Sequence, residues 1–273
     1  MPGNGWFEHA CRKLGYRCKN VAISGENPMN ACDKIWRGIL YTREELENID
    51  FFVLSHTHNY NIAYTNDTST ILQKTVEDYE AKGYDDNGLP ISGIPDPSNP
   101  QHHILPQTGG SAHGYYPQND ILNERYAAGF DYLIKKYTLD CYNLRLDPTS
   151  KWYGTKSGKP CNVIICSYWH DGYTVYNEAA KIVALKHGAI YCDIASKVGF
   201  SYKQTDPTDK NSIRQSLLYC NNTAFGSGND SEDIPINGVI YTNMGWHATR
   251  DVNSPLTVKR GDILASTFIN YNS

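Results

Sequence analysis

Short continuous apolar runs alternate with amphipathic segments along this chain, and this alternation constrains its fold more than any other feature. Residues 50–55, 163–168 and 189–194 are apolar runs of strand length, a pattern typical of strands covered on both faces. Segments with apolar residues at helical spacing lie between them. Strands that alternate with helices predict a parallel sheet with right-handed crossovers. We therefore expect a single α/β domain over residues 1–273.

The spacing of apolar residues also sets the expected elements. Helices are predicted at residues 6–14, 29–39, 43–48, 71–82, 120–137, 176–187, 213–219 and 257–269, with Gly15 ending the first. Further strands are predicted at residues 20–24 and 239–241. Residues 83–118 carry Gly, Pro, Asn, Asp, His and Ser with almost no apolar periodicity, which predicts a long binding loop or lid.

Composition excludes several classes of partner. The net charge is −4 and the pI is about 6.1, so we expect no nucleic-acid partner. No apolar run approaches the roughly 20 residues of a membrane helix, so we expect no membrane span.

No signal peptide is visible in the sequence. A signal that had been removed would leave the same sequence, and the protein would then be periplasmic or secreted. The eight cysteines form no C-x-x-C pair, and we expect mostly reduced thiols.

Polar residues follow several of the expected strands. In parallel α/β sheets the ligand crevice lies at the carboxyl ends of the strands, so residues 24–27, 55–61, 168–172 and the loop before the last helix are the segments of interest. Gly25 follows the expected strand at residues 20–24. A glycine there lets backbone N–H groups approach an anion closely, as in an oxyanion hole, although it could also serve the turn alone.

Histidines occur at two of these positions. His56 and His58 follow the run at residues 50–55. Two histidines at this spacing can bind a metal, whereas His58 or Asn59 can instead donate a hydrogen bond to a developing oxyanion. His247 lies in the loop before the last helix, where it could act as a general base. A plain polar loop is the alternative at both positions.

The order of these segments resembles the SGNH, or GDSL-type, hydrolases over essentially the whole chain. Gly25 matches the turn glycine of the family's second block, and the segment around His58 and Asn59 lies where the third block, Gly-x-Asn-Asp, follows an apolar strand. His247 takes the histidine position of the fifth block, Asp-x-x-His. The resemblance implies a three-layer α/β/α fold with a mostly parallel, flavodoxin-like sheet. It implies Gly25, Asn59 and His58 as oxyanion donors and His247 as the catalytic base, with no metal and no cofactor.

The sequence departs from the family at two places. The first block, Gly-Asp-Ser, carries the nucleophile and does not occur here, so we expect the chain to be a fragment that lacks one strand. Ser24 precedes the second-block glycine and is a poor substitute. Met244 takes the place of the fifth-block aspartate. Asn243 is adjacent but would orient His247 more weakly, because an amide cannot stabilise an imidazolium as a carboxylate does.

Three functions remain open on the sequence. The resemblance favours hydrolysis of an acyl ester on a polar, carbohydrate-like substrate, in an enzyme whose nucleophile is missing from this chain. A non-catalytic carbohydrate-binding protein on the same scaffold is the second. The third is a degenerate metal hydrolase, because residues 49–58 also resemble the His-x-His-x-Asp-His strand end of metallo-β-lactamases. In that alignment, Tyr60 and Asn61 replace two of the ligands.

Overall fold

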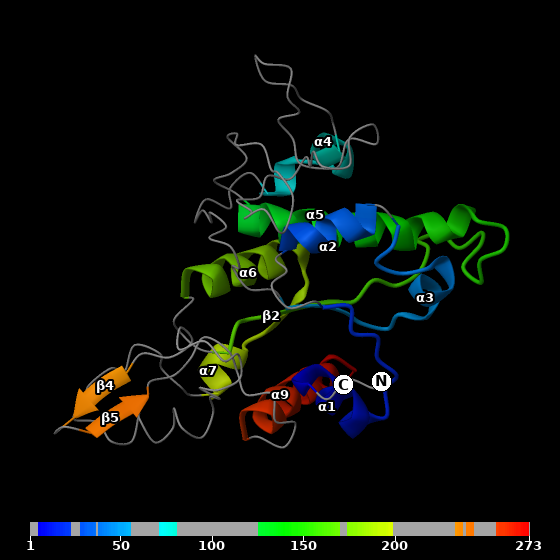
Figure 1. Ribbon diagram of the computed structural model, residues 1–273. Coiled ribbons are helices and arrows are strands. Elements are labelled where there is room, and N and C mark those ends of the chain that lie inside the picture. Colours follow the sequence, from blue (N-terminus) through cyan, green and yellow to red (C-terminus); the bar gives the residue numbers. More distant parts are fainter. Residues whose placement is uncertain are drawn as a thin grey trace, which may run out of the picture. The chain divides into compact units, whose positions relative to one another are not determined.

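The computed structural model describes residues 5–22, 28–36, 38–55, 71–80, 125–169, 174–198, 233–236, 239–242 and 255–272. The chain divides into two compact units (Figure 1). The central unit comprises Val21–Ser167 and Thr174–Tyr191, and the terminal unit comprises Met1–Asn20, Tyr168–Tyr173 and Cys192–Ser273. The expectation of a single domain stays a prediction.

A small parallel sheet lies in the central unit, apart from Cys192, the last residue of its third strand. Its strands are β1 (Phe52–Leu54), β2 (Val163–Cys166) and β3 (Ile190–Cys192), in the order β1-β2-β3. β1 pairs in parallel with β2, with Phe52 opposite Val163 and Leu54 opposite Ile165. The chain contains both helices and strands, and three of its strands form a parallel sheet, which confirms the α/β class.

Strand β2 is covered on both of its faces. All four of its side chains are buried. Val163 and Ile165 belong to the main core cluster, whereas Ile164 and Cys166 are buried outside that cluster, as expected for a strand whose side chains alternate between faces. In β1, by contrast, Phe52 and Val53 are only half-buried, because β1 is an outer strand of the described sheet.

Helix α5 (Arg125–Asn143) is the centre of the core of the central unit. It contacts α2 (Pro28–Trp36) and α6 (Thr174–His187), and α6 also contacts β2. The three helices lie close together in Figure 1. Phe52 of β1 stacks on Tyr137 of α5 with ring centroids 4.4 Å apart, which ties the sheet to the helix. Offset-stacked rings of this kind contribute about 1 kcal/mol beyond their buried area.

In the terminal unit, helix α1 (Trp6–Leu14) packs on helix α9 (Pro255–Asn272). The contact is close at Gly261, where an added Cβ would lie 2.7 Å from the carbonyl oxygen of Trp6. Asp262 accepts hydrogen bonds from Lys13 at 2.7 Å and His9 at 3.1 Å. The Lys13 hydrogen bond is the main reason that the pKa of Asp262 is lowered. Helix α7 (Ile194–Val198) also contacts α9.

The terminal unit also contains a two-stranded antiparallel sheet, made of β4 (Asp233–Ile236) and β5 (Val239–Thr242). Strand β5 confirms the expected extended segment at residues 239–241, whereas β4 is an element that the sequence reading did not include. Asp233 lies opposite Thr242 and Ile236 opposite Val239.

Helices α1 and α3 (Arg43–Asn48) have the predicted bounds, and the ends of α2, α6 and α9 lie within three residues of the predicted ones. Helix α5 continues six residues beyond its predicted end. Within the described residues, the helix predicted at residues 71–82 is interrupted, as a 3-10 turn, η1 (Ile71–Gln73), followed by α4 (Val76–Glu80). The cause is Thr75, whose hydroxyl accepts from the Asp78 N–H while the Asp78 carboxylate accepts from the Thr75 N–H. This reciprocal pair starts a new helix.

The strand predicted at residues 20–24 is wrong over residues 20–22, which have no regular secondary structure and are exposed. Asn20 donates from its side chain to Glu8 at 2.9 Å, so it serves to fix the chain after α1. Val21 is 38% exposed, because an apolar run this short gives little surface to bury. Residues 83–118 and 213–219 lie outside the described residues.

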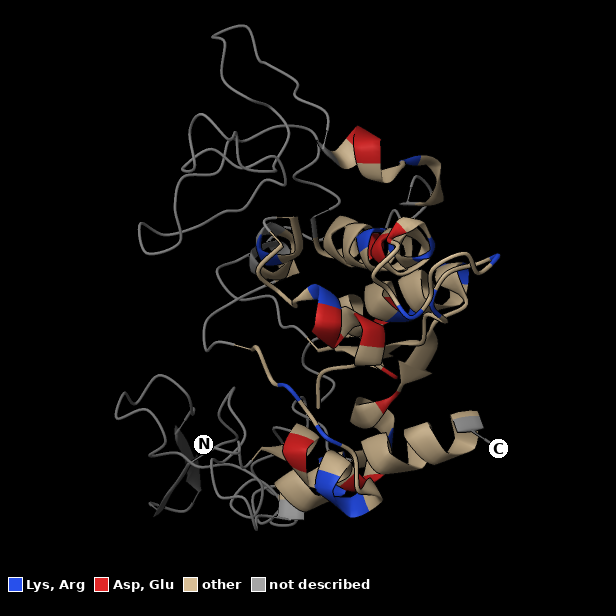
Figure 2. Cartoon of the chain, turned by 90° about the vertical axis from the view of Figure 1, so that its right-hand side faces the viewer, with Lys and Arg blue, Asp and Glu red and all other residues tan. Residues whose placement is uncertain are grey.

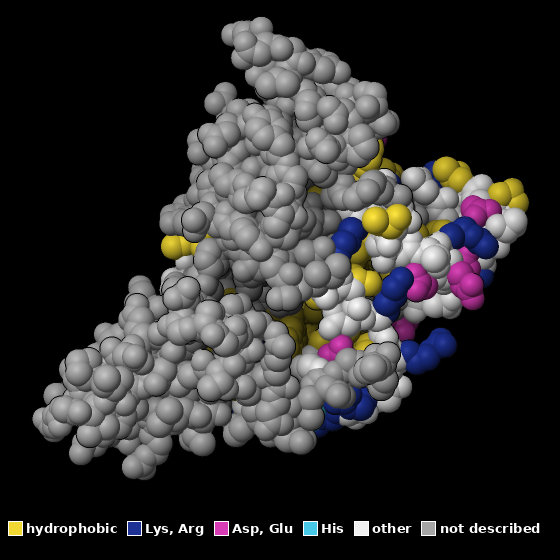
Figure 3. Space-filling model, in the orientation of Figure 1, with side chains coloured by type: hydrophobic (Ala, Val, Ile, Leu, Met, Phe, Trp, Pro, Cys, Tyr) yellow, Lys and Arg dark blue, Asp and Glu magenta, His cyan; other side chains and the backbone are white. Residues whose placement is uncertain are grey.

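Acidic and basic residues are mixed along the described helices (Figure 2). Exposed apolar side chains occur near the carboxyl end of α5 (right-hand side of Figure 3), where Tyr142 is 40%, Leu146 60% and Tyr153 56% exposed. Among the described residues, no helix has both the length and the apolar character needed to cross a membrane.

Candidate functional site

The carboxyl ends of β1 and β2 lie side by side at one edge of the sheet in the central unit. The two strands run parallel to each other, with Leu54 opposite Ile165. Ser55 follows β1 and is half-buried, and Ser167 follows β2 and is 1% exposed. The sequence continues from Ser55 into residues 56–61. The structure therefore confirms that the apolar run before the two histidines is a strand that ends beside the end of β2.

The residues singled out in the sequence lie outside the described part of the chain. This holds for every proposed oxyanion donor, the proposed base and its neighbours: Ser24, Gly25, His56, His58, Asn59, Asn243, Met244 and His247. Their grouping and their roles stay predictions.

A buried carboxylate forms a polar cluster among the described residues of the central unit. Asp131 of α5 is fully buried. Its Oδ1 lies 2.6 Å from Nε2 of His187, at the end of α6. Its Oδ2 accepts from Nζ of Lys135 and from the hydroxyl of Tyr79, both at 2.7 Å. Lys135 also donates to the carbonyl oxygen of Lys74.

The positions of these residues follow from the helices that carry them. Asp131 and Lys135 are four residues apart on α5, so their side chains lie on one face. His187 is the last residue of α6, where the helix dipole favours a cation. Burying a carboxylate is costly unless it is paired and hydrogen-bonded, and the three donors satisfy this one.

The contact with Asp131 orients the His187 ring. An ionised carboxylate only accepts hydrogen bonds, so Nε2 of His187 is the donor in this contact whenever the carboxylate is ionised. A carboxylate that holds an imidazole in one tautomer is the orienting half of an acid–base dyad. The same bonds also join α4, α5 and α6, and this structural role is the one that the geometry establishes directly.

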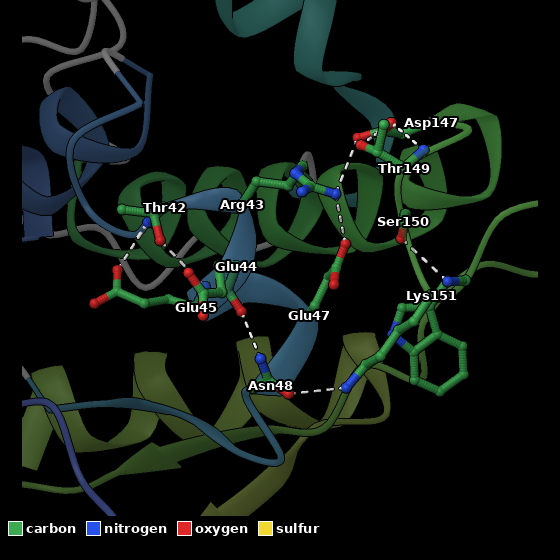
Figure 4. Close-up of polar contacts among 11 residues, drawn as sticks. Thr42, Arg43, Glu44, Glu45, Glu47, Asn48, Asp147, Thr149, Ser150 and Lys151 are labelled. Carbon is green, nitrogen blue, oxygen red and sulfur yellow. Dashed lines mark hydrogen bonds and ion pairs between the residues drawn. The ribbon is translucent and has the colours of Figure 1, made fainter.

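A second polar cluster surrounds α3 and has a structural role (Figure 4). Arg43 contacts Glu47 at 2.8 Å and Asp147 at 3.3 Å, and Lys151 donates to the side chain of Asn48 at 2.9 Å. These bonds join α3 to the segment after α5. The side chains of Arg43 and Asp147 are 48% and 32% exposed, and exposed pairs of this kind contribute at most about 1 kcal/mol.

The described residues contain no group of three or more His, Cys, Asp or Glu side chains that could hold a metal ion. His56 and His58 are not among these residues, so the metal hypothesis is not decided by this finding.

The model of one protein family matches residues 1–87 and 115–248, and the description of that family is "Domain of unknown function (DUF5040)". No curated protein and no solved structure matches the chain.

Proposed function

The chain belongs to the DUF5040 family, and we propose that it is the scaffold of an SGNH-type ester hydrolase. The proposed reaction is acyl-ester hydrolysis on a polar or carbohydrate-linked substrate. In this proposal the fold is the three-layer α/β/α type with a mostly parallel, flavodoxin-like sheet.

The parallel pairing of β1 with β2 is the observation that carries the proposal. It supports a doubly wound sheet, because antiparallel neighbours would contradict one. The coverage of both faces of β2 agrees with a layer on each side of the sheet. The segment that holds His58 and Asn59 follows β1 directly in the sequence, as the third block of these hydrolases follows its strand.

The proposed mechanism gives each residue one task. A serine attacks the ester carbonyl, and His247 accepts its proton and later gives it to the leaving alcohol. The N–H of Gly25, together with the side chain of Asn59 or His58, binds the oxyanion that forms. Such donors contribute most when they are preorganised at the position where charge develops. The mechanism needs a Gly-Asp-Ser block, which the printed residues do not contain.

The test compares three proteins: this chain, the chain preceded by a strand that ends in Gly-Asp-Ser, and the same extended chain with that serine changed to alanine. The substrates are 4-nitrophenyl acetate and an acetylated xylo-oligosaccharide. We expect turnover by the extended chain to exceed that of the other two by about 10⁴-fold, the usual scale for losing a triad member.

Two results would overturn the proposal. The first is full turnover by the chain without the added strand. The second is the absence of turnover by an extended chain that folds and binds the oligosaccharide, which would favour a non-catalytic carbohydrate-binding protein.

A further inference from the structure

Two cysteine thiols of the central unit meet between helix α5 and the approach to β2. Cys141 lies in the last turn of α5, and Cys161 lies two residues before β2. Each thiol is the main cause of the pKa shift of the other. The hydroxyl of Thr138, three residues before Cys141 on the same face of α5, lies 3.4 Å from the sulfur of Cys161.

Hydrogen bonds to backbone carbonyls fix the segment on both sides of Cys161. The N–H of Lys159 donates to the carbonyl oxygen of Cys141 at 3.0 Å. Gly158 permits this approach, because its φ is +71° and an added Cβ would lie 2.4 Å from that same oxygen. On the other side of Cys161, the side chain of Asn162 donates to the carbonyl oxygen of Asp50 at 3.1 Å.

The two thiols have different environments. Cys141 is 1% exposed, whereas Cys161 is half-buried and its neighbour Thr138 is exposed. The hydrogen bond from Cys141 is the main reason that the pKa of Cys161 is lowered to about 7, with Thr138 and Lys159 also lowering it and burial opposing them. The bond with Cys161 and burial raise the pKa of Cys141.

The other titratable groups that act on this pair are few. Lys159 is buried, and burial lowers its pKa. Tyr137 of α5 interacts with both cysteines, and burial raises its pKa. Asp50 acts on Lys159 and Tyr137. A thiolate is the reactive form of cysteine toward oxidants, and of these two thiols only that of Cys161 has a lowered pKa.

We propose that peroxide oxidises the thiols of Cys161 and Cys141, which then form a reversible disulfide between α5 and the segment before β2. The Cys161 thiolate attacks one peroxide oxygen, the O–O bond breaks, and the hydroxide released takes up a proton to become water, leaving a sulfenic acid. The Cys141 sulfur then attacks the Cys161 sulfur. The S–O bond breaks and the hydroxyl leaves with the Cys141 proton as a second water. The two thiols lose two electrons and two protons in all, the peroxide takes them up to become two waters, and an external dithiol reverses the change.

The first test uses the unmodified protein. It is treated with hydrogen peroxide, blocked with iodoacetamide and digested with trypsin, and the peptides are read by mass spectrometry. Trypsin leaves Cys161 and Cys166 on one peptide, so fragmentation between them identifies the linked sulfur. We expect a dithiothreitol-sensitive link from Cys141 to Cys161. Peroxide-treated protein in which both of these thiols remain alkylated would overturn the proposal.

Two variants separate the chemistry from effects on folding. Cys141→Ser keeps a hydroxyl donor beside Cys161, so the alkylation midpoint of Cys161 stays near 7, but oxidation stops at a sulfenic acid that dimedone traps. Cys141→Ala removes the donor, so alkylation of Cys161 at about pH 6.5 slows by roughly tenfold.

Cys32→Ser is the control, because the Cys32 thiol of the same unit donates to the carbonyl oxygen of Gly129. In this variant, the alkylation rate and the oxidation product should match those of the unmodified protein. An unchanged rate in Cys141→Ala would overturn the assignment of Cys161 as the activated thiol.

Discussion

At the scale of single residues, Asp131 is a polar group that connects the described helices of the central unit. It is fully buried and joins side chains from three helices, through Tyr79, Lys135 and His187. Breaking a buried ion pair by removing one partner is strongly destabilising, because the remaining charge stays buried without compensation.

Asp131→Asn should therefore lower the free energy of unfolding by roughly 3 kcal/mol. The control is Asp140→Asn on the same helix. Asp140 is bonded to a lysine four residues away, Lys136, and accepts from the hydroxyl of Tyr41 at 2.9 Å, but its side chain is 21% exposed, so a smaller loss of about 1–2 kcal/mol is expected. Urea titration measures both. Equal losses in the two variants would contradict the central role of Asp131.

The sequence analysis did not single out Asp131, although the pattern of residues around it indicates a buried carboxylate. Asp131 lies between Phe130 and Tyr132 and four residues after Ala127, within the apolar pattern that predicts the helix. An acidic residue in such a position needs a buried partner. Its partners Tyr79 and His187 are more than fifty residues away in sequence, so no local pattern could have identified them.

At the scale of elements, the approach of the segment before β2 to the end of α5 depends on one glycine. Gly158 and Gly154 both have a φ near +70°. An added Cβ at Gly158 would lie 2.4 Å from the carbonyl oxygen of Cys141, whereas at Gly154 it would meet nothing within 4 Å.

Gly154→Ala should therefore cost only the strain of the left-handed conformation, about 1–2 kcal/mol. Gly158→Ala adds a clash with backbone and should cost roughly 3 kcal/mol or more. Thermal unfolding of both variants checks the difference. If Gly158→Ala were no less stable than Gly154→Ala, the close packing of this segment on α5 would be wrong.

Helices were easier to predict than strands for a physical reason. Their apolar spacing extends over many residues, and caps such as Thr42 mark their starts. Strand β4 was missed because Pro235 argues against a strand, although the Asn237-Gly238 pair that follows it is a strong hairpin signal. Residues 20–22 were wrongly included in a strand because their apolar run is too short to show whether it is covered.

At the scale of the whole molecule, the α/β class could be predicted because the order of elements in the sequence determines it. Which strands are neighbours could not be predicted in the same way. The pairing of β1 with β2 joins segments about 110 residues apart, and only tertiary packing decides it. The proposed oxyanion donors and base fall outside the described residues, so their roles rest on the sequence.

The metal content separates two of the hypotheses. We expect elemental analysis of the purified protein to show no stoichiometric zinc, because Tyr60 and Asn61 stand where a metal hydrolase would have an aspartate and a histidine. One or two zinc ions per chain, lost together with activity on adding a chelator, would favour the metal hydrolase.

The most direct test of the proposed function is the effect of His247→Ala on turnover by the chain preceded by the Gly-Asp-Ser strand. The control is His102→Ala, since His102 lies in the polar segment at residues 83–118 and has no task in the proposed mechanism. We expect His247→Ala to lower kcat on 4-nitrophenyl acetate by about 10³-fold or more and His102→Ala to leave it unchanged. A kcat for His247→Ala within about twofold of the parent enzyme would contradict the assignment of His247 as the catalytic base, and with it the proposed hydrolase mechanism.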